Sequence, residues 1–398
     1  MIHRIHELVW GPWLLALFLG IGIAYTIKSG FFQIRKLSFW WNQTIGSIRE
    51  EDREKDSVTK FQTACTALAA TIGTGNIVGV ATALTAGGPG AIVWMWISAA
   101  IGMMTGYAET MLGIRYRYRD ENGAWICGPM VYLERGAGLP WLGMAYSFLC
   151  IMVSLGMGSM VQSNSIAQTL EYTFRTSAVP VGLFLTGAVF LVIAGGIGRI
   201  AFVSERLIPL SSGIYMLFSL VVIMSCYDRI PHIFQCIFQD AFRPAAAFSG
   251  TAGYGISRSL QYGVARGVFS NEAGLGSMAV LHGAAEDTTP HKQGMWAMFE
   301  VFFDTILICT MTAFVILCMT DGNAAGPGYD GAALTAYCFS ERLGGLGEYV
   351  VSGAMLVFAF ATIIAWYYLG RQAAVYLAEN LKKRKVLYFL QRILRGKV

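Results

Sequence analysis

The stretch Thr71-Ile72-Gly73-Thr74-Gly75-Asn76 interrupts an otherwise apolar run at residues 61–85. Two glycines weaken a helix here, and a polar amide faces a medium that penalises it. A second apolar run, 257–281, carries Ser270-Asn271-Glu272-Ala273-Gly274-Leu275-Gly276-Ser277, with the same Gly-x-Gly-polar pattern. Backbone that leaves the helix at membrane depth is tolerated only where it is buried in protein or lines a cavity. The two stretches therefore predict two broken membrane helices whose free amides and carbonyls are available to a ligand.

The composition indicates a protein whose solvent is lipid. Hydrophobic residues make up 55% of the 398 residues and charged residues 13%, whereas about 25% of residues are charged in typical globular proteins. The net charge of +5 comes from short basic clusters between apolar runs, which argues against a nucleic-acid partner. We therefore expect an all-α polytopic membrane protein embedded in the lipid bilayer.

Apolar runs long enough to cross a membrane recur along the chain. A helix crosses the hydrocarbon core in about 20 residues. Nine runs of roughly this length carry no charge or carry it near their ends, and they occupy residues 8–27, 61–85, 90–113, 141–174, 180–198, 207–227, 257–281, 294–320 and 346–370. The first is a full span long and is followed by a polar, basic segment, so we interpret it as a membrane helix rather than a secretory signal.

The spacing of the two interrupted runs predicts an inverted repeat. They lie five spans apart, and an odd number of spans makes the second unit enter the membrane in the opposite direction. Paired broken helices in two inverted halves indicate the binding site of a secondary transporter. The alternative is that each Gly-x-Gly merely lets two helices pack closely. The predicted organisation is an N-terminal span with a basic cytoplasmic loop (1–60), a first five-helix repeat (61–227), an extracellular loop (228–256), an incomplete second repeat (257–370) and a basic cytoplasmic tail (371–398).

The distribution of basic residues predicts the orientation. Short cytoplasmic loops hold the excess of Lys and Arg in membrane proteins. Most of the 29 Lys and Arg residues fall in loops on one side, whereas the other side has Arg4, Arg175, Arg229, Arg243 and Arg342. We therefore expect a multi-pass protein of the plasma (inner) membrane, with its N-terminus outside and its C-terminus in the cytoplasm.

Several longer motifs resemble one transporter family. They are Gly73-Thr74-Gly75-Asn76-Ile77-Val78-Gly79-Val80-Ala81, Gly87-Gly88-Pro89-Gly90-Ala91, Trp94-Met95-Trp96 and Arg266-Gly267-Val268-Phe269-Ser270-Asn271-Glu272-Ala273-Gly274. In this order they resemble the alanine or glycine:cation symporter family, the sodium:alanine symporters, which shares the ten-helix inverted-repeat fold of the neurotransmitter:sodium symporters. The resemblance implies sodium-coupled symport of small neutral amino acids such as alanine and glycine into the cytoplasm. It implies no enzymatic activity and no cofactor besides sodium as the coupling ion.

The resemblance also implies a binding site at the two breaks. The amides of Thr74 and Gly75 would receive the substrate carboxylate, and carbonyls near Thr71, Phe269 and Ser270 would receive its ammonium group. A first sodium site would use Asn76 with Ser270 or Asn271, and a second would use the carbonyls of Ala69 and Ile72 and the hydroxyl of Thr362. Whether both sodium sites are used stays open.

Two further side chains are implied at the substrate. The fourth span carries a small or polar stripe at helical spacing, formed by Gly158, Ser159, Gln162 and Ser165. The family has a glutamine that contacts substrate on this helix, so Gln162 is the candidate, and a hydrogen bond between helices is the alternative. Trp366 lies one helical turn after Thr362 and would act as a size filter.

Four acids lie in or beside apolar spans, namely Glu109, Glu272, Glu300 and Asp304. Such groups indicate functional sites or ion pairs, and Arg266 is the expected partner. We expect gating or packing roles for these acids rather than direct contact with substrate.

Two other classes of function compete with a transporter. The segment Thr251-Ala252-Gly253-Tyr254-Gly255 resembles a potassium selectivity filter, as in a cation channel, but that leaves both breaks unexplained and supplies one strand where a filter needs four. A membrane hydrolase would need a Gly-x-Ser-x-Gly elbow or a zinc signature, and the sequence has neither.

The number of spans after the second break is smaller than the resemblance implies. Only two spans follow the run 257–281, whereas the family's fold requires four. The chain is therefore expected to be C-terminally short by two helices, and a non-transporting truncated homologue is a further alternative.

Overall fold

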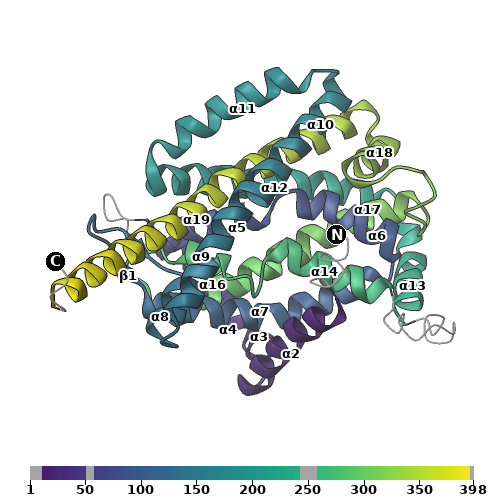
Figure 1. Ribbon diagram of the computed structural model, residues 1–398. Helices are drawn as coiled ribbons and strands as arrows, with labels where there is room; N and C mark the ends of the chain where they lie inside the picture. The colour runs from purple at the N-terminus through teal and green to yellow at the C-terminus, as the bar shows by residue number, and fades with distance from the viewer. Residues whose placement is uncertain (1–10, 51–57, 243–257, 395–398) are drawn as a thin grey trace.

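The computed structural model describes residues 11–50, 58–242 and 258–394, which form a bundle of helices with one short hairpin (Figure 1). The first helices are α2 (Pro12–Lys28), α3 (Phe32–Arg35), α4 (Leu37–Gln43), η1 (Ile45–Glu50), α5 (Lys60–Thr71), η2 (Gly75–Gly79), α6 (Val80–Gly87) and α7 (Ala91–Tyr116). The antiparallel strands β1 (Tyr118–Arg119) and β2 (Trp125–Ile126) follow, and then α8 (Pro129–Arg135), α9 (Pro140–Leu155), η3 (Gly156–Val161), α10 (Gln162–Phe174), α11 (Ala178–Ile193) and α12 (Gly196–Met224). The remaining helices are η4 (Tyr227–Arg229), α13 (Ile230–Ala241), α14 (Arg258–Asn271), α15 (Ser277–His282), α16 (Pro290–Val301), η6 (Phe302–Cys309), α17 (Thr310–Met319), α18 (Gly331–Leu343) and α19 (Gly345–Leu394).

Two long helices organise the bundle. Helix α7 packs along α14, α15 and α16, and helix α19 packs along α9, α10, α12 and α18. Helix α5 joins the two groups, because it contacts α12 and α19 as well as α15 and α16. Helices α2 and α11 lie at opposite edges of the bundle in Figure 1. The exposed apolar side chains of α11, such as Leu183 and Phe184, are typical of a surface that faces lipid.

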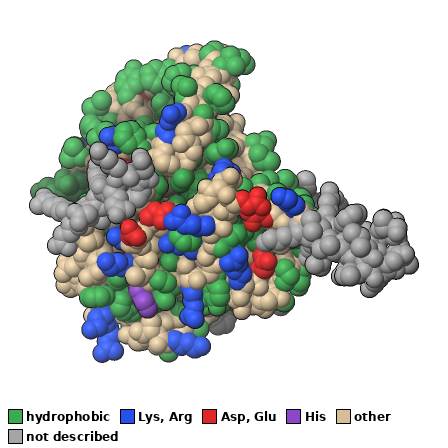
Figure 2. Space-filling view, turned by 90° about the vertical axis from the view of Figure 1, so that its left-hand side faces the viewer, with side chains coloured by type: hydrophobic (Ala, Val, Ile, Leu, Met, Phe, Trp, Pro, Cys, Tyr) green, Lys and Arg blue, Asp and Glu red, His purple; other side chains and the backbone are tan. Residues whose placement is uncertain are grey.

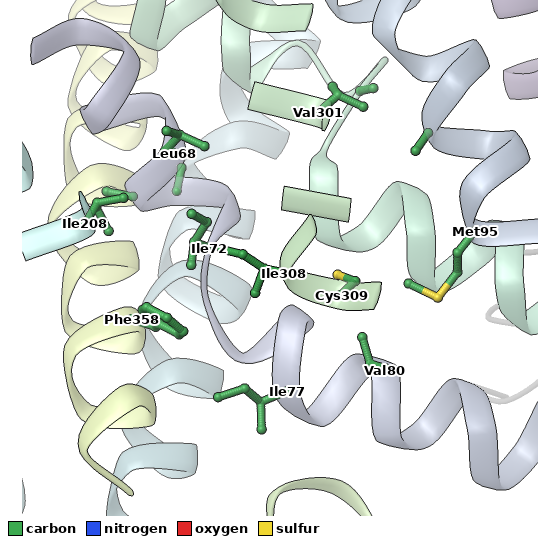
Figure 3. Close-up of a cluster of buried hydrophobic side chains, with 14 of the residues drawn as sticks. Leu68, Ile72, Ile77, Val80, Met95, Ile208, Val301, Ile308, Cys309 and Phe358 are labelled. Carbon is green, nitrogen blue, oxygen red and sulfur yellow. The ribbon is translucent and has the colours of Figure 1, made fainter. Parts of the chain in front are cut away.

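The first predicted break is confirmed. Helix α5 begins with a capping box between Thr59 and Gln62 and ends at Thr71. Ile72 leaves the helical conformation, the chain resumes as the π-helical turn η2 at Gly75, and the axis bends by 50°. Figure 3 shows this path, with Ile72 before the bend and Ile77 after it.

The second predicted break is also confirmed. Helix α14 ends at Asn271 and α15 begins at Ser277. Between them Glu272, Gly274 and Gly276 all have positive φ angles, of 56°, 91° and 84°. Glycine adopts this conformation without penalty, whereas a residue with a Cβ atom loses roughly 1–2 kcal/mol. Glu272 is therefore held in an unfavourable conformation within the break.

Most of the expected spans correspond to long apolar helices in the described residues. Five helical units in the described part of the chain are long and apolar enough to cross a membrane: Ala91–Tyr116, Pro140–Phe174, Gly196–Met224, Pro290–Met319 and Gly345–Lys382. The bent pair α5–α6 makes six. The other expected spans correspond to the broken pair α14–α15 and to two shorter apolar helices, Trp13–Lys28 and Ala178–Ile193. The protein is thus an all-α polytopic membrane protein; in the described residues six of the nine expected runs form long apolar helical units, and the full number of spans stays a prediction.

Several short elements were not predicted. Helix α13 lies in the segment 228–256 that was expected to be a loop, and helix α19 continues through the expected tail to Leu394. Helices α8 and α18 and the hairpin were missed because they are too short to cross a membrane. The filter-like motif at 251–255 lies outside the described residues.

Candidate functional site

The two breaks lie against each other inside the bundle. A methyl group added to Gly75 would come within 3.3 Å of the Cα atom of Ser270, so the first break touches the last turn of α14. Asn76 is 0% exposed, and Ser270 and Asn271 are each 1% exposed. Apolar side chains surround this region (Figure 3). Folding therefore assembles a buried polar site from two segments that are far apart in the sequence.

Asp304 connects the two breaks through hydrogen bonds. Its Oδ1 accepts a hydrogen bond of 2.6 Å from Nδ2 of Asn76, and its Oδ2 accepts one of 2.8 Å from the hydroxyl of Ser270. The hydroxyl of Thr305 donates to the same Oδ2 at 2.9 Å. Asp304 is 0% exposed and forms no ion pair with any described Lys, Arg or His. Because an unpaired buried carboxylate is costly, these oxygens are suited to a small hard cation.

The two asparagines stabilise the shape of the breaks. Oδ1 of Asn76 accepts a hydrogen bond of 3.0 Å from the backbone amide of Gly73, while its Nδ2 donates to Asp304. Oδ1 of Asn271 accepts one of 3.1 Å from the backbone amide of Ala273. Both predicted sodium ligands therefore cap backbone amides here. Rotation of the Asn76 amide by about 180° would turn its oxygen toward the position beside Asp304.

The predicted donors of a second sodium site come from α5 and α19. The hydroxyl of Thr362 donates to the carbonyl of Phe358 at 3.0 Å and lies 3.4 Å from the carbonyl of Ile72. A methyl group added to Gly73 would lie 2.6 Å from the same hydroxyl. Ala69 is fully buried near the end of α5, close in sequence to Ile72. The structure thus brings Thr362 next to the first break.

Gln162 contacts the amide that was predicted to receive the substrate carboxylate. The backbone amide of Thr74 donates to Oε1 of Gln162 at 3.4 Å. Nε2 of Gln162 donates to the carbonyl of Met157 at 3.4 Å. Both Gln162 and Thr74 are almost fully buried. The observed contact is a hydrogen bond between α10 and the first break, which was the alternative role, and it also puts Gln162 in the predicted substrate position.

Trp366 of α19 lies between η3 and the second break. A methyl group added to Gly158 of η3 would overlap with Cβ of Trp366, so η3 and α19 meet there without intervening space. The indole is 4% exposed and lies beside the carboxylate of Glu272. Phe269 is half-buried, and the guanidinium of Arg266 lies 5.8 Å from the centre of its ring.

The expected ion pairs between the buried acids and Arg266 are wrong. Oε2 of Glu109 accepts hydrogen bonds of 3.1 Å from the backbone amides of Gly274 and Gly276, so this acid holds the second break. Glu300 contacts His282 at 3.1 Å and the hydroxyl of Thr71 at 3.4 Å. The acids contact polar groups that folding brings to them rather than the arginine that is near in sequence.

A cavity of about 320 Å³ lies beside η2, α6 and α10, beyond the first break and Gln162. Val78 and Thr82 line it one and two turns beyond the first break, and Ser165 and Thr169 line it beyond Gln162 on the same face of α10. Its other lining residues include Tyr172 and Asp330, which are exposed. The cavity therefore extends from the surface toward the central site.

Comparison with known proteins identifies the family. The sodium:alanine symporter family matches residues 1–395 of the chain. The chain belongs to this family. It is 42% identical over 395 residues to an uncharacterised transporter of Haemophilus influenzae, covering 98% of this chain and 85% of that protein. It is 40% identical over 384 residues to the sodium/alanine symporter AgcS of Methanococcus maripaludis, covering 95% and 83%. It is 36% identical over 391 residues to the probable sodium/glutamine symporter GlnT of Bacillus subtilis, covering 98% and 78%.

Membership of the sodium:alanine symporter family supports the prediction of a transporter. The family and its named relatives are transporters, which points to a sodium-coupled amino-acid transporter of a membrane and away from an enzyme. The expectation that the chain is short by two helices gains no support from these comparisons, in which the Haemophilus influenzae transporter matches 98% of this chain.

Proposed function

We propose that this chain carries a small neutral amino acid, such as alanine or glycine, into the cytoplasm together with sodium. The observation that supports it best is the contact of Asp304 with both Asn76 and Ser270. One buried carboxylate between the two breaks is a suitable ligand for a coupling ion. The proposal includes an inverted-repeat bundle like that of the neurotransmitter:sodium symporters, in the inner membrane, with the N-terminus outside.

In this proposal sodium acts first on Asp304. A cation at its carboxylate would also be coordinated by the hydroxyl oxygen of Ser270. The amide oxygen of Asn76 would become a further ligand after that amide rotates. Neutralising the buried charge would draw the two breaks together, because each side now supplies oxygens to one ion. A second ion would bind the carbonyls of Ala69 and Ile72 with the hydroxyl of Thr362. The first ion would thereby connect both breaks to η6, and the second would connect the first break to α19.

The substrate would bind next to these ions. Its carboxylate would replace Oε1 of Gln162 at the amide of Thr74 and contact the amide of Gly75, both at the N-terminus of a half-helix. Its ammonium group would face carbonyls near Thr71, Phe269 and Ser270, where the freed backbone is available. Trp366 would limit the side chain to a small one. The cavity beyond Gln162 would be the access route.

Uptake into proteoliposomes tests the proposal. The purified chain is expected to accumulate labelled alanine or glycine under an inward sodium gradient and to exchange substrate by counterflow. A cation channel would conduct without counterflow, and an enzyme would convert the amino acid chemically. Sodium-dependent binding without uptake would identify a non-transporting homologue and overturn the proposal.

Replacement of Gln162 by glutamate should weaken substrate binding. A second carboxylate beside the Thr74 amide would repel the carboxylate of the amino acid. Such a contact costs about 2 kcal/mol, so the apparent affinity for alanine should fall roughly thirtyfold. Gln168→Glu, on the same helix but exposed in the outer cavity, is the matched control. Equal alanine affinities in the two variants would show that Gln162 does not contact the substrate.

Trp366→Leu should relax selection by size. Leucine opens space against Gly158, so larger apolar amino acids should compete better with alanine. Hydrophobic discrimination is about 1–3 kcal/mol per methylene, so the valine-to-alanine competition ratio should rise in a graded way. Tyr367→Leu, at the exposed neighbouring position, should leave the ratio unchanged. A ratio in the Trp366 variant equal to that of the wild type would contradict the role of a size filter.

A further inference from the structure

A second cavity lies away from the central site, between α2, α7 and α16. Its volume is about 480 Å³. Met104, Ala108, Met111 and Arg115 line it from α7. These positions are three or four residues apart, so they follow one face of the helix. The result is an apolar groove along α7 that ends at a basic side chain.

The open end of the groove is positively charged. Lys28 of α2 and Arg115 of α7 both line the cavity and are exposed. Within the described residues neither forms an ion pair. Figure 2, which views the left-hand side of Figure 1, shows several Lys and Arg side chains on this face of the molecule.

Polar groups complete the same end. His291, the second residue of α16, lines the cavity, and its Nδ1 lies 2.7 Å from the hydroxyl of Tyr107. Ser29 adds a hydroxyl next to Lys28. Two cations and several polar groups therefore lie at the end of a groove whose remaining length is apolar.

We propose that this cavity binds one anionic phospholipid, with its phosphate at Lys28 and Arg115 and an acyl chain along Met104, Ala108 and Met111. Basic pockets between membrane helices bind lipid head groups of this charge. A free phosphate would leave the apolar groove unused. The amino-acid substrate would need an acidic group for its ammonium, and the lining of this cavity has none. The lipid would join the N-terminal helix α2 to α7 and α16.

Native mass spectrometry of the detergent-solubilised full chain tests this proposal. With phosphatidylglycerol added, we expect one lipid to stay bound under conditions that remove phosphatidylcholine. The double variant Lys28→Gln/Arg115→Gln should lose it. Each basic residue changes the affinity for an anionic lipid roughly fivefold, so the two together should lower it about thirtyfold. Arg206→Gln, an exposed basic residue that lies over Phe202 outside the cavity, is the matched control.

A second variant tests the apolar part of the site. Ala108→Trp keeps both cations but fills the groove, so it should also lose the retained phosphatidylglycerol. Retention by this variant would mean that the lipid only adsorbs to surface charge, and would overturn the proposal. Equal retention by the wild type and the double variant would overturn it as well. So would displacement of the lipid by millimolar inorganic phosphate, which would identify a site for free anions.

Discussion

Asp304→Asn is expected to abolish sodium-coupled uptake while leaving the protein folded. Asparagine has the same shape but no charge, so the hydrogen bonds around Asn76 and Ser270 can largely remain while the sodium ligand is lost. Losing a charged ligand in a buried site costs roughly 3 kcal/mol, which raises the half-saturating sodium concentration more than about a hundredfold. The measurement is alanine uptake into proteoliposomes at increasing sodium concentrations.

Thermal unfolding gives an independent test of the same variant. A ligand that binds only the folded state stabilises it, by about 2.7 kcal/mol at 100 times its dissociation constant. Sodium chloride, compared with choline chloride, should raise the Tm of the wild type more than that of Asp304→Asn, in which only the second proposed sodium site remains. Asp240→Asn is the control, because Asp240 also accepts a hydrogen bond from another element, at Gly90, but lies away from the breaks. A Tm of Asp304→Asn that rises with sodium as much as that of the wild type would contradict the assignment.

The two breaks could be predicted from the sequence because their signal is local. A Gly-x-Gly pair followed by a polar residue weakens the helix wherever it occurs, whatever the rest of the chain does. The resemblance then supplied Gln162, Thr362 and Trp366, and the structure brings Gln162 and Thr362 to the first break and Trp366 beside the second. Their roles as ligands stay predictions.

The role of Asp304 could not be predicted in the same way. Asp304 lies in η6, whereas its partners Asn76 and Ser270 come from η2 and α14, and only folding brings these three segments together. Sequence reasoning chose Arg266 because it is a cation close by in the chain, yet that guanidinium lies over Phe269. The only available signal was an acid within an apolar span, which indicates function but names no partner.

The short helices were missed for a different reason. Counting apolar runs finds segments that cross a membrane, but α13 and α18 are of 12 and 13 residues and pack on other helices instead. Helix α18 contacts α19 and η2, so it supports the first break and contributes Gly331 to the outer cavity. Tertiary packing, rather than hydropathy, decides where such helices form.

Gly73→Ala is expected to impair sodium coupling severely, because the added methyl group would enter the junction of the two predicted sites. It would lie 2.6 Å from the hydroxyl of Thr362 and 3.4 Å from Oε1 of Gln162, so the Thr362 hydroxyl must move away from the Ile72 carbonyl. Overpacking of this kind costs about 1–3 kcal/mol, which corresponds to a fall in sodium affinity of roughly 5- to 150-fold. Gly79→Ala is a closely matched control, since it adds the same methyl group to the same broken helix at a position with nothing within 4 Å.

Sodium titrations of alanine uptake should therefore separate the two variants, with Gly79→Ala close to the wild type and both proteins folded. If Gly73→Ala responds to sodium as Gly79→Ala does, the junction between Gly73 and Thr362 has no part in ion binding, and the second sodium site must be sought elsewhere.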